Sequence, residues 1–265
     1  MWDVFIGLSI LYSTIFIPFS IGFLADNDES SVQKSLDIAV DALFLLDILI
    51  TFQTPFVCRT TNILVTDRTA IAKNYISFWF FIDFAGSGPV DHITRAIVEL
   101  TSSASSASNI SSIRLLRVLR LARLAKLFRI LTSQNMKDLL ERFRISPSVM
   151  SVVFLIFQIF LIAHILSCFW FYIATDLATG GKSPNDPNVF YSNPTWIIVY
   201  GCDQYDTVSQ YILALFWTFQ TLLSVGYGDT HPVNTLERAY GSLVMLIGCL
   251  MFGSIVAKVG GNSKF

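Results

Sequence analysis

Charged side chains are scarce in this chain. Asp, Glu, Lys and Arg make up only 14% of its 265 residues, whereas a soluble domain usually carries about 25%. The net charge of −1 argues against a nucleic-acid partner, because such a partner requires a basic surface. Hydrophobic residues make up 53% of the chain and the mean hydropathy is +0.59, so the composition predicts a membrane protein.

Cysteines and catalytic patterns are also sparse. Cys58, Cys168 and Cys249 lie in or beside apolar segments and only Cys202 lies in a long polar loop, so no disulfide framework is predicted. The sequence shows no nucleophile–base arrangement, no metal-ligand cluster and no phosphate-binding glycine loop. We therefore predict that the protein is not an enzyme and uses no cofactor.

Long apolar runs are the main feature that is present. Runs of about 20 residues can span a bilayer as helices, and six segments, the third of them short, predict an all-α membrane fold. A seventh stretch, Tyr211–Leu223, is too short to span and is expected to be a re-entrant helix. The six predicted spans are Trp2–Leu24, Leu36–Phe56, Ile76–Val90, Ile113–Leu131, Val149–Thr175 and Leu236–Val259.

The re-entrant helix leads into a segment that resembles the selectivity filter of potassium channels. In such a filter successive carbonyls replace the water shell of an axial ion, which requires backbone angles that glycine tolerates at alternate positions. One chain supplies a quarter of the ring, so a homotetramer is predicted. The predicted filter comprises Ser224, Val225, Gly226, Tyr227, Gly228 and Asp229, and the first four of these are expected to bind K+ as the permeant ion.

A stripe of bases recurs at every third position of the fourth predicted span. Such a stripe also suits an amphipathic helix on an anionic membrane or a basic nucleic-acid helix. We favour a voltage sensor, because the orientation of the neighbouring spans requires this helix to cross. Each elementary charge that moves across 100 mV contributes about 2.3 kcal/mol to gating. The same stripe serves channels that open on depolarisation and channels that open on hyperpolarisation. The predicted gating charges are Arg114, Arg117, Arg120, Arg123, Lys126 and Arg129.

Acidic residues are expected to pair with these bases, because an unpaired base in a bilayer is costly. Phe44 precedes Asp47 by about one helical turn and could cap a narrow site that the bases pass singly. Phe44, Asp47 and Asp83 thus resemble the charge-transfer centre of voltage sensors, although the acids could instead neutralise the bases statically. The predicted countercharges are Asp3, Asp37, Asp41, Asp47, Asp83 and Asp91.

Basic residues also gather in two connections, Val57–Lys73 and Leu131–Pro147. By the positive-inside rule both termini are then cytoplasmic and the filter opens outward. The plasma membrane is the expected location. Asn109, in the sequon Asn109-Ile110-Ser111, would be an external glycosylation acceptor.

Motifs along nearly the whole chain resemble voltage-gated potassium channels of the ether-à-go-go and cyclic-nucleotide-binding-domain superfamily. The resemblance implies a four-helix voltage sensor over 1–131, a linker over 132–147 and a two-helix pore domain over 148–265. A short linker in such relatives places each sensor beside its own subunit's pore helices, so the tetramer is expected not to be domain-swapped. The matching motifs are Trp2-Asp3, Asp37 to Ile50, Trp79 to Asp83, Ala163-His164, Cys168 to Trp170 and Val244 to Ile255.

The filter departs from that superfamily at two positions. Ether-à-go-go channels usually have Phe and Asn where Tyr227 and Asp229 stand, so this filter resembles the general potassium-selective type. Many voltage-gated potassium channels also place a Trp thirteen residues before the filter aspartate, to which it donates a hydrogen bond. Phe216 holds that position here, so we expect a less braced outer mouth that tends to inactivate.

Three further residues carry smaller predictions. Gly248 in the last predicted span is expected to be either a gating hinge or a point of close packing against the re-entrant helix. His164 is expected to hydrogen-bond within the helix bundle. His231, beyond the filter, is a candidate pH sensor or an ordinary exposed side chain.

Together these observations predict a homotetrameric voltage-gated potassium channel in a lipid bilayer. A non-selective or cyclic-nucleotide-modulated cation channel is an alternative that the intact filter disfavours. A silent modulatory subunit, which alters related channel subunits without conducting alone, is the third candidate.

Overall fold

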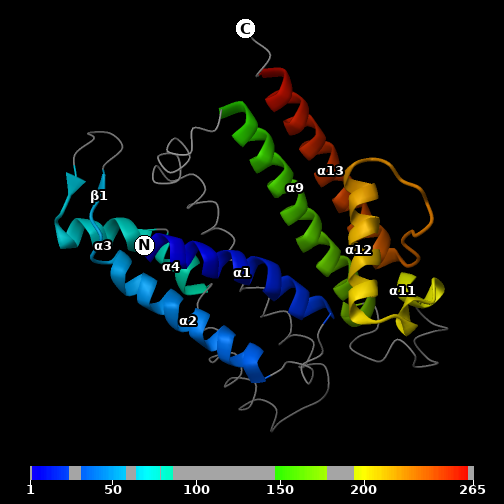
Figure 1. Ribbon diagram of the computed structural model, residues 1–265, viewed down its shortest axis with the longest axis horizontal. Helices are drawn as coiled ribbons and strands as arrows, with labels where there is room; N and C mark the ends of the chain where they lie inside the picture. Colours follow the sequence, from blue (N-terminus) through cyan, green and yellow to red (C-terminus); the bar gives the residue numbers. More distant parts are fainter. Residues whose placement is uncertain are drawn as a thin grey trace. The chain divides into compact units, whose positions relative to one another are not determined.

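The computed structural model describes residues 2–23, 31–57, 64–77, 79–85, 147–177 and 194–261 (Figure 1). Helices dominate these ranges, and one small sheet joins them. The chain divides into two compact units, Met1–Ile17 with Ala25–Lys137 and Pro18–Leu24 with Asp138–Phe265. The division falls inside the first helix, at Pro18.

The first unit is built from four helices and a hairpin. Helix α1 (Trp2–Phe23) contributes its first part, and α2 (Ser31–Thr51) packs against α4 (Trp79–Ala85). Helix α3 (Arg68–Ser77) directly precedes α4. Strands β1 (Phe56–Val57) and β2 (Leu64–Val65) pair antiparallel between α2 and α3, which adds a short sheet to the predicted all-α fold.

Two predicted spans of this unit need correction. Helix α2 begins before Leu36 and ends at Thr51, because the chain turns there and Phe56 joins the hairpin. The third span was predicted as Ile76–Val90, but the helix starts at Arg68, where the Asp67 carboxylate accepts the N–H groups of Thr69 and Ala70. This cap satisfies orphan donors of the first turn. Residues 86–90 and the fourth predicted span lie outside the described residues.

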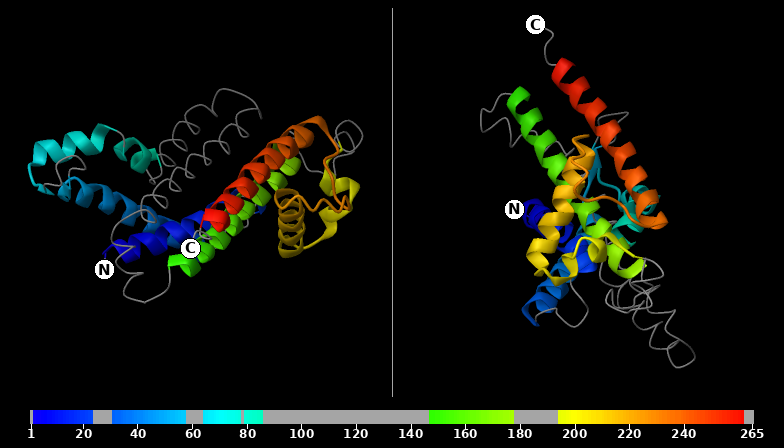
Figure 2. Two further views of the ribbon diagram at one scale, coloured as in Figure 1. Left: turned by 90° about the horizontal axis from the view of Figure 1, so that it is seen from above. Right: turned by 90° about the vertical axis from the view of Figure 1, so that its right-hand side faces the viewer.

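The second unit contains the two long helices and the re-entrant one. Helix α9 (Pro147–Tyr172) continues into a π-helical turn, η2 (Ile173–Leu177). After α11 (Trp196–Val199) and the 3-10 turn η3 (Cys202–Gln204), α12 (Thr207–Leu222) leads to the filter segment and α13 (Thr235–Gly261) follows it. Helices α9 and α13 run side by side, and α12 packs against both (Figures 1 and 2).

A stack of three tryptophans forms the centre of this unit. The ring of Trp170 in α9 lies parallel to that of Trp217 in α12, with 3.9 Å between centroids, and to that of Trp196 in α11, at 5.5 Å. All three side chains are buried. Large buried aromatic rings contribute much of the hydrophobic stabilisation of a core, so this stack fixes α12, and with it the start of the filter, against α9.

The end of α1 also belongs to the second unit. Phe23 stacks on Phe171 of α9 at 4.1 Å and meets the edge of Tyr211 in α12 at 5.6 Å. A Cβ added at Gly22 would lie 2.7 Å from the carbonyl oxygen of Cys168. Glycine therefore lets α1 approach the backbone of α9 closely.

Among the described residues, three helices are long and apolar enough to cross a membrane, over Val4–Phe23, Val152–Thr175 and Thr235–Ala257. They correspond to the first, fifth and sixth predicted spans. The re-entrant helix begins at Thr207 and not at Tyr211 as predicted, since Asp206 occupies its N-cap position and the Asp206 carbonyl accepts the N–H of Gln210. The helix of the sixth span ends at Gly261, the second residue of the glycine pair 260–261.

Gly248 is a point of close helix packing. A Cβ added there would lie 2.7 Å from the carbonyl oxygen of Leu222 and 3.0 Å from its Cα, at the end of α12. Helix α13 runs through Gly248 without interruption. Of the two predictions for this residue, the structure supports packing against the re-entrant helix.

We predict that Gly248→Ala lowers the thermal melting temperature of the purified protein, because its methyl group must displace the backbone of α12, at a cost of about 1 to 3 kcal/mol. Gly253→Ala is the matched control, since nothing lies within 4 Å of a Cβ at that position. Alanine there should leave the melting temperature unchanged or raise it, as alanine favours a helix by about 1 kcal/mol over glycine. Equal melting temperatures of Gly248→Ala and Gly253→Ala would contradict the packing role of Gly248.

Candidate ion-conduction site

The filter segment follows the C-terminus of α12 directly and has an alternating backbone. The φ angles of Ser224, Gly226 and Gly228 are 57°, 58° and 77°, all in the left-handed region. Glycine adopts such angles readily, whereas a side chain is strained there. The sequence predicted this role for the two glycines, and the structure adds Ser224. The alternation suits a row of carbonyls that face one ion path.

The end of α12 turns its partial negative charge toward this segment. The carbonyl oxygen of Gln220 accepts the N–H of Val225 at 2.8 Å and of Gly226 at 3.2 Å, so these donors are bound to the helix end. No charged residue lies within α12 itself. The C-terminal end of a helix favours a nearby cation, and here that end adjoins the filter.

The side chain of Gln220 joins both sides of the filter. Its Nε2 donates to Asp229 Oδ1 at 3.0 Å, and its Oε1 accepts the backbone N–H of Tyr227 at 2.9 Å. The prediction of a less braced mouth is therefore wrong about Asp229, because a glutamine provides the brace in place of a tryptophan. A glutamine in an apolar helix was the missed signal, since a buried amide needs partners.

The neighbouring aromatic residues take other roles. The ring of Phe216, which has no donor, lies parallel to the ring of Tyr227 with 6.1 Å between centroids. Trp217 faces the tryptophan stack and not the filter. Tyr227 is 72% exposed in the single chain, and the place of its side chain in the wall of the filter stays a prediction.

Glu237 anchors the chain that returns from the filter. Its side chain is fully buried, and it accepts the backbone N–H groups of Val233 at 2.8 Å and of Trp196 at 3.1 Å. Asn234 Oδ1 accepts the N–H of Glu237 in return, at 2.9 Å. This is a capping box at the start of α13, and it also fixes the start of α11. The role of Glu237 was not predicted, although Asn-x-x-Glu before an apolar run is the usual sequence signature of this box.

The two histidines of this unit both bond to tyrosines. His164 Nδ1 lies 2.8 Å from the hydroxyl of Tyr211, which links α9 to α12 and confirms the predicted bond within the bundle. His231, in the loop after the filter, lies 2.6 Å from the hydroxyl of Tyr200.

At the start of α12 the hydroxyl of Ser209 donates to Asp206 and lowers the pKa of Asp206 below its ordinary value.

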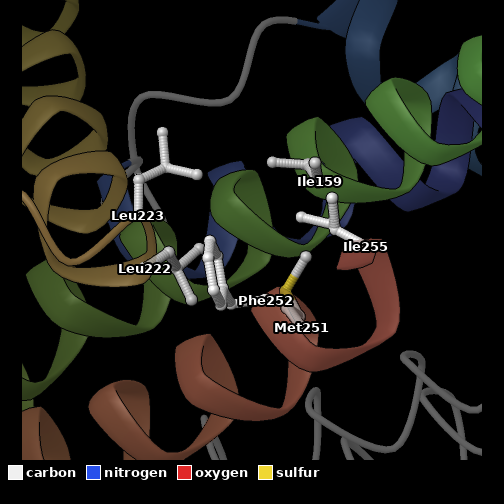
Figure 3. Close-up of a pocket in the computed structure, with 6 residues that line it drawn as sticks. All are labelled: Ile159, Leu222, Leu223, Met251, Phe252 and Ile255. Carbon is white, nitrogen blue, oxygen red and sulfur yellow. The ribbon is translucent and has the colours of Figure 1, made fainter. Parts of the chain in front are cut away.

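A small apolar hollow lies where the C-terminal half of α13 passes the end of α12 (Figure 3). Its lining side chains come from α9, α13 and the end of α12, and all are apolar. They are Ile159, Leu222, Leu223, Met251, Phe252 and Ile255. Such a lining offers no ligand for an ion, so ion-binding chemistry in this region depends on the filter backbone.

The predicted charge-transfer residues lie in the first unit. Phe44 of α2 is fully buried. Asp47, on the same helix, accepts a hydrogen bond from Trp2 Nε1 at 3.1 Å, and Asp83 of α4 is 1% exposed and accepts one from the hydroxyl of Tyr75 at 2.6 Å. Each of these two carboxylates thus accepts a hydrogen bond from a neutral donor of the same unit.

Asp37 and Asp41 are half-buried, as Asp47 is, whereas Asp83 is fully buried. Asp37 accepts a hydrogen bond from the hydroxyl of Tyr12 at 3.4 Å, and Asp41 is half-buried one turn further along α2. The other predicted sensor residues lie outside the described part of the chain. These are Asp3, Asp91, Arg114, Arg117, Arg120, Arg123, Lys126 and Arg129, and the predicted glycosylation acceptor Asn109 also lies outside the described residues. For Asp3 this applies to the side chain only.

Comparison with known proteins adds the family context. The profile of the family described as ion transport protein matches residues 1–263. The chain is 32% identical to the voltage-gated inwardly rectifying potassium channel KCNH7 of Mus musculus, and the match covers 98% of this chain and 21% of that protein. It is 31% identical to KCNH2 of Cavia porcellus and to KCNH6 of Rattus norvegicus, channels of the same description, again over 98% of the chain. These matches cover 19% and 27% of those relatives, so the chain spans about a quarter of their length or less.

We predict that Glu237→Ala lowers the free energy of unfolding by about 2 kcal/mol or more, because it leaves buried N–H groups without an acceptor. Glu237→Gln, which keeps one acceptor oxygen, should lose less. Arg238→Ala is the control at the next, exposed position. Thermal melting of the purified proteins measures the order of their stabilities. A melting temperature of Glu237→Ala equal to that of the control would contradict the anchoring role.

Proposed function

Because the chain belongs to the ion transport protein family, we propose that it forms the transmembrane core of a voltage-gated, potassium-selective channel. The observation that carries this proposal is the alternating left-handed backbone at Ser224, Gly226 and Gly228, directly after the C-terminus of α12. A row of carbonyls in that position can replace the hydration shell of K+. The names of the relatives, which are potassium channels, support the same chemistry.

We propose that four copies assemble around the filter. One chain supplies one quarter of a carbonyl ring, and the chain leaves an apolar stripe uncovered next to it. Val208, Ile212 and Phe216 recur every fourth residue on α12 and are 61%, 58% and 43% exposed. With Tyr227 they form a surface that a second copy of the chain could bury, as exposed apolar patches of this kind mark interfaces.

The sensor is proposed to lie beside the pore of its own subunit. The short predicted linker over 132–147 supports this arrangement, which has no domain swapping. Six spans in total, cytoplasmic termini and a place in the plasma membrane complete the proposal. These points follow from the predicted spans and the loop charges, together with the three candidate membrane helices.

Voltage sensing is proposed to use the acids of α2 and α4. Phe44 is buried on α2, the helix that also carries Asp47, and Asp83 is buried on the adjacent α4. A base that crosses the membrane next to buried carboxylates is stabilised at each step. The bases would therefore pass these residues in turn and move charge across the field.

The first test is the reversal potential of purified protein in a planar bilayer, with K+ on one side and Na+ on the other. We expect voltage-dependent current that reverses near the potassium equilibrium potential. Gly226→Ala should abolish it, because alanine is strained at a φ of 58°, whereas Gly253→Ala should still conduct. Reversal near zero would contradict potassium selectivity. A protein that carries no current alone, but current together with related channel subunits, would favour a modulatory subunit.

The second test addresses the sensor. Arg120→Gln should flatten the dependence of conductance on voltage, since each charge that crosses the field contributes to its steepness. Arg238→Gln, an exposed base on α13, is the matched control and should leave the steepness unchanged. Equal steepness in all three proteins would contradict a gating role for the stripe.

A further inference from the structure

The buried acid Asp83 of α4 is bound by a side chain of the preceding helix. The hydroxyl of Tyr75 in α3 donates to Asp83 Oδ2 at 2.6 Å, a distance typical of a hydroxyl that bonds to a carboxylate. Asp83 is 1% exposed and Tyr75 is 4% exposed. Among the described acids of the first unit, only Asp83 is buried. The bond therefore lies in the interior of this unit, where water does not compete for it.

The ring of Tyr75 is held from two sides. Phe52, the residue that follows α2, meets this ring edge-on with 4.9 Å between centroids, and Phe80 of α4 meets it edge-on at 6.1 Å. Phe52 and Phe80 also contact each other, at 5.9 Å. Edge-to-face contacts of this kind favour one orientation of each ring. The three aromatic rings thus fix the hydroxyl of Tyr75 relative to the end of α2 and to α4.

A carboxylate in such surroundings needs a permanent donor. Burial of a charge is costly unless hydrogen bonds or opposite charges compensate for it. In the proposed sensor, the bases of the fourth span pass Asp83 one at a time, so each base is only a temporary partner. When a base departs, the loss of a partner leaves the buried charge less compensated, which raises the free energy of the state between two sensor positions. The hydroxyl of Tyr75 remains bonded during that step.

We propose that Tyr75 is a positioning residue of the voltage sensor, and that its hydroxyl speeds the movement of the bases past Asp83. This inference rests on the proposed voltage-sensing function. Tyr75 acts through Asp83, whose carboxylate it orients and stabilises, and the neutral hydroxyl leaves the negative charge of that carboxylate in place. Without the hydroxyl, Asp83 would hold each base more tightly and release it more slowly.

Three substitutions isolate this bond. Tyr75→Phe removes the hydroxyl and keeps the ring that packs on Phe52 and Phe80. Asp83→Asn removes the charge and keeps the shape of the side chain, and a bond from Tyr75 to this neutral amide is weaker than one to a carboxylate. Tyr205→Phe is the matched control, because Tyr205 is 51% exposed and lies between η3 and α12.

The experiment compares the time constants with which K+ current activates and deactivates, each at the variant's own half-activation voltage. We expect both to be about tenfold slower in Tyr75→Phe than in the wild type, the effect of one lost hydrogen bond to a charged group. Tyr205→Phe should match the wild type. In the Asp83→Asn background, Tyr75→Phe should change the time constants little, because no buried charge is left to compensate. Unchanged or faster kinetics in Tyr75→Phe, or equal slowing in both backgrounds, would overturn the proposal.

A second measurement does not depend on current. The change in melting temperature that Tyr75→Phe causes in the purified full chain should be smaller when Asp83→Asn is also present, because both substitutions weaken the same bond. Equal changes in the two backgrounds would overturn the proposal. A wild type that carries no voltage-dependent current would contradict the proposed function alone, since the melting experiment still decides whether Tyr75 holds Asp83.

Discussion

The second unit depends on one constraint, which is that residues 224–229 cannot hold their own conformation. Left-handed angles recur at every second residue, and the N–H groups of Val225, Gly226 and Tyr227 are all bound by Gln220. The position of α12 therefore decides the shape of the filter. Two other features of the unit hold α12 in this position. Trp217 fixes α12 in the tryptophan stack, and Gly248 lets α13 approach the end of α12 closely.

The return path from the filter is constrained from the opposite side. Glu237 binds the loop at Val233 and the start of α11 at Trp196, whose ring joins the same stack as Trp217. The loop before α12 and the loop after the filter are thus fixed to one buried carboxylate. A carboxylate buried this deeply is tolerated only when it accepts hydrogen bonds. The N–H groups of Val233 and Trp196 therefore hold the Glu237 side chain in place, and Glu237 in turn holds these two segments.

The parts of this site that follow from local chemistry could be predicted from the sequence. The glycine spacing predicted the filter, and the apolar stretch after Tyr211 predicted the re-entrant helix, because both depend on residues next to each other in the chain. The start of α12 at Thr207 and the start of α3 at Arg68 were missed, since caps at Asp206 and Asp67 outweigh hydropathy there. The brace by Gln220 depends on the fold of the chain back along its own helix, and a search for the usual tryptophan could not reveal it.

We propose that four copies of the chain enclose a potassium-binding filter whose conformation Gln220 holds. A cryo-electron microscopy map of the purified protein in lipid nanodiscs and K+ solution would test this arrangement. We expect four subunits, a row of ion densities along the axis between residues 224 and 227, and the Gln220 amide in contact with Asp229 in every subunit. A particle without fourfold symmetry, or a Gln220 side chain turned away from an ordered, ion-filled filter, would contradict it.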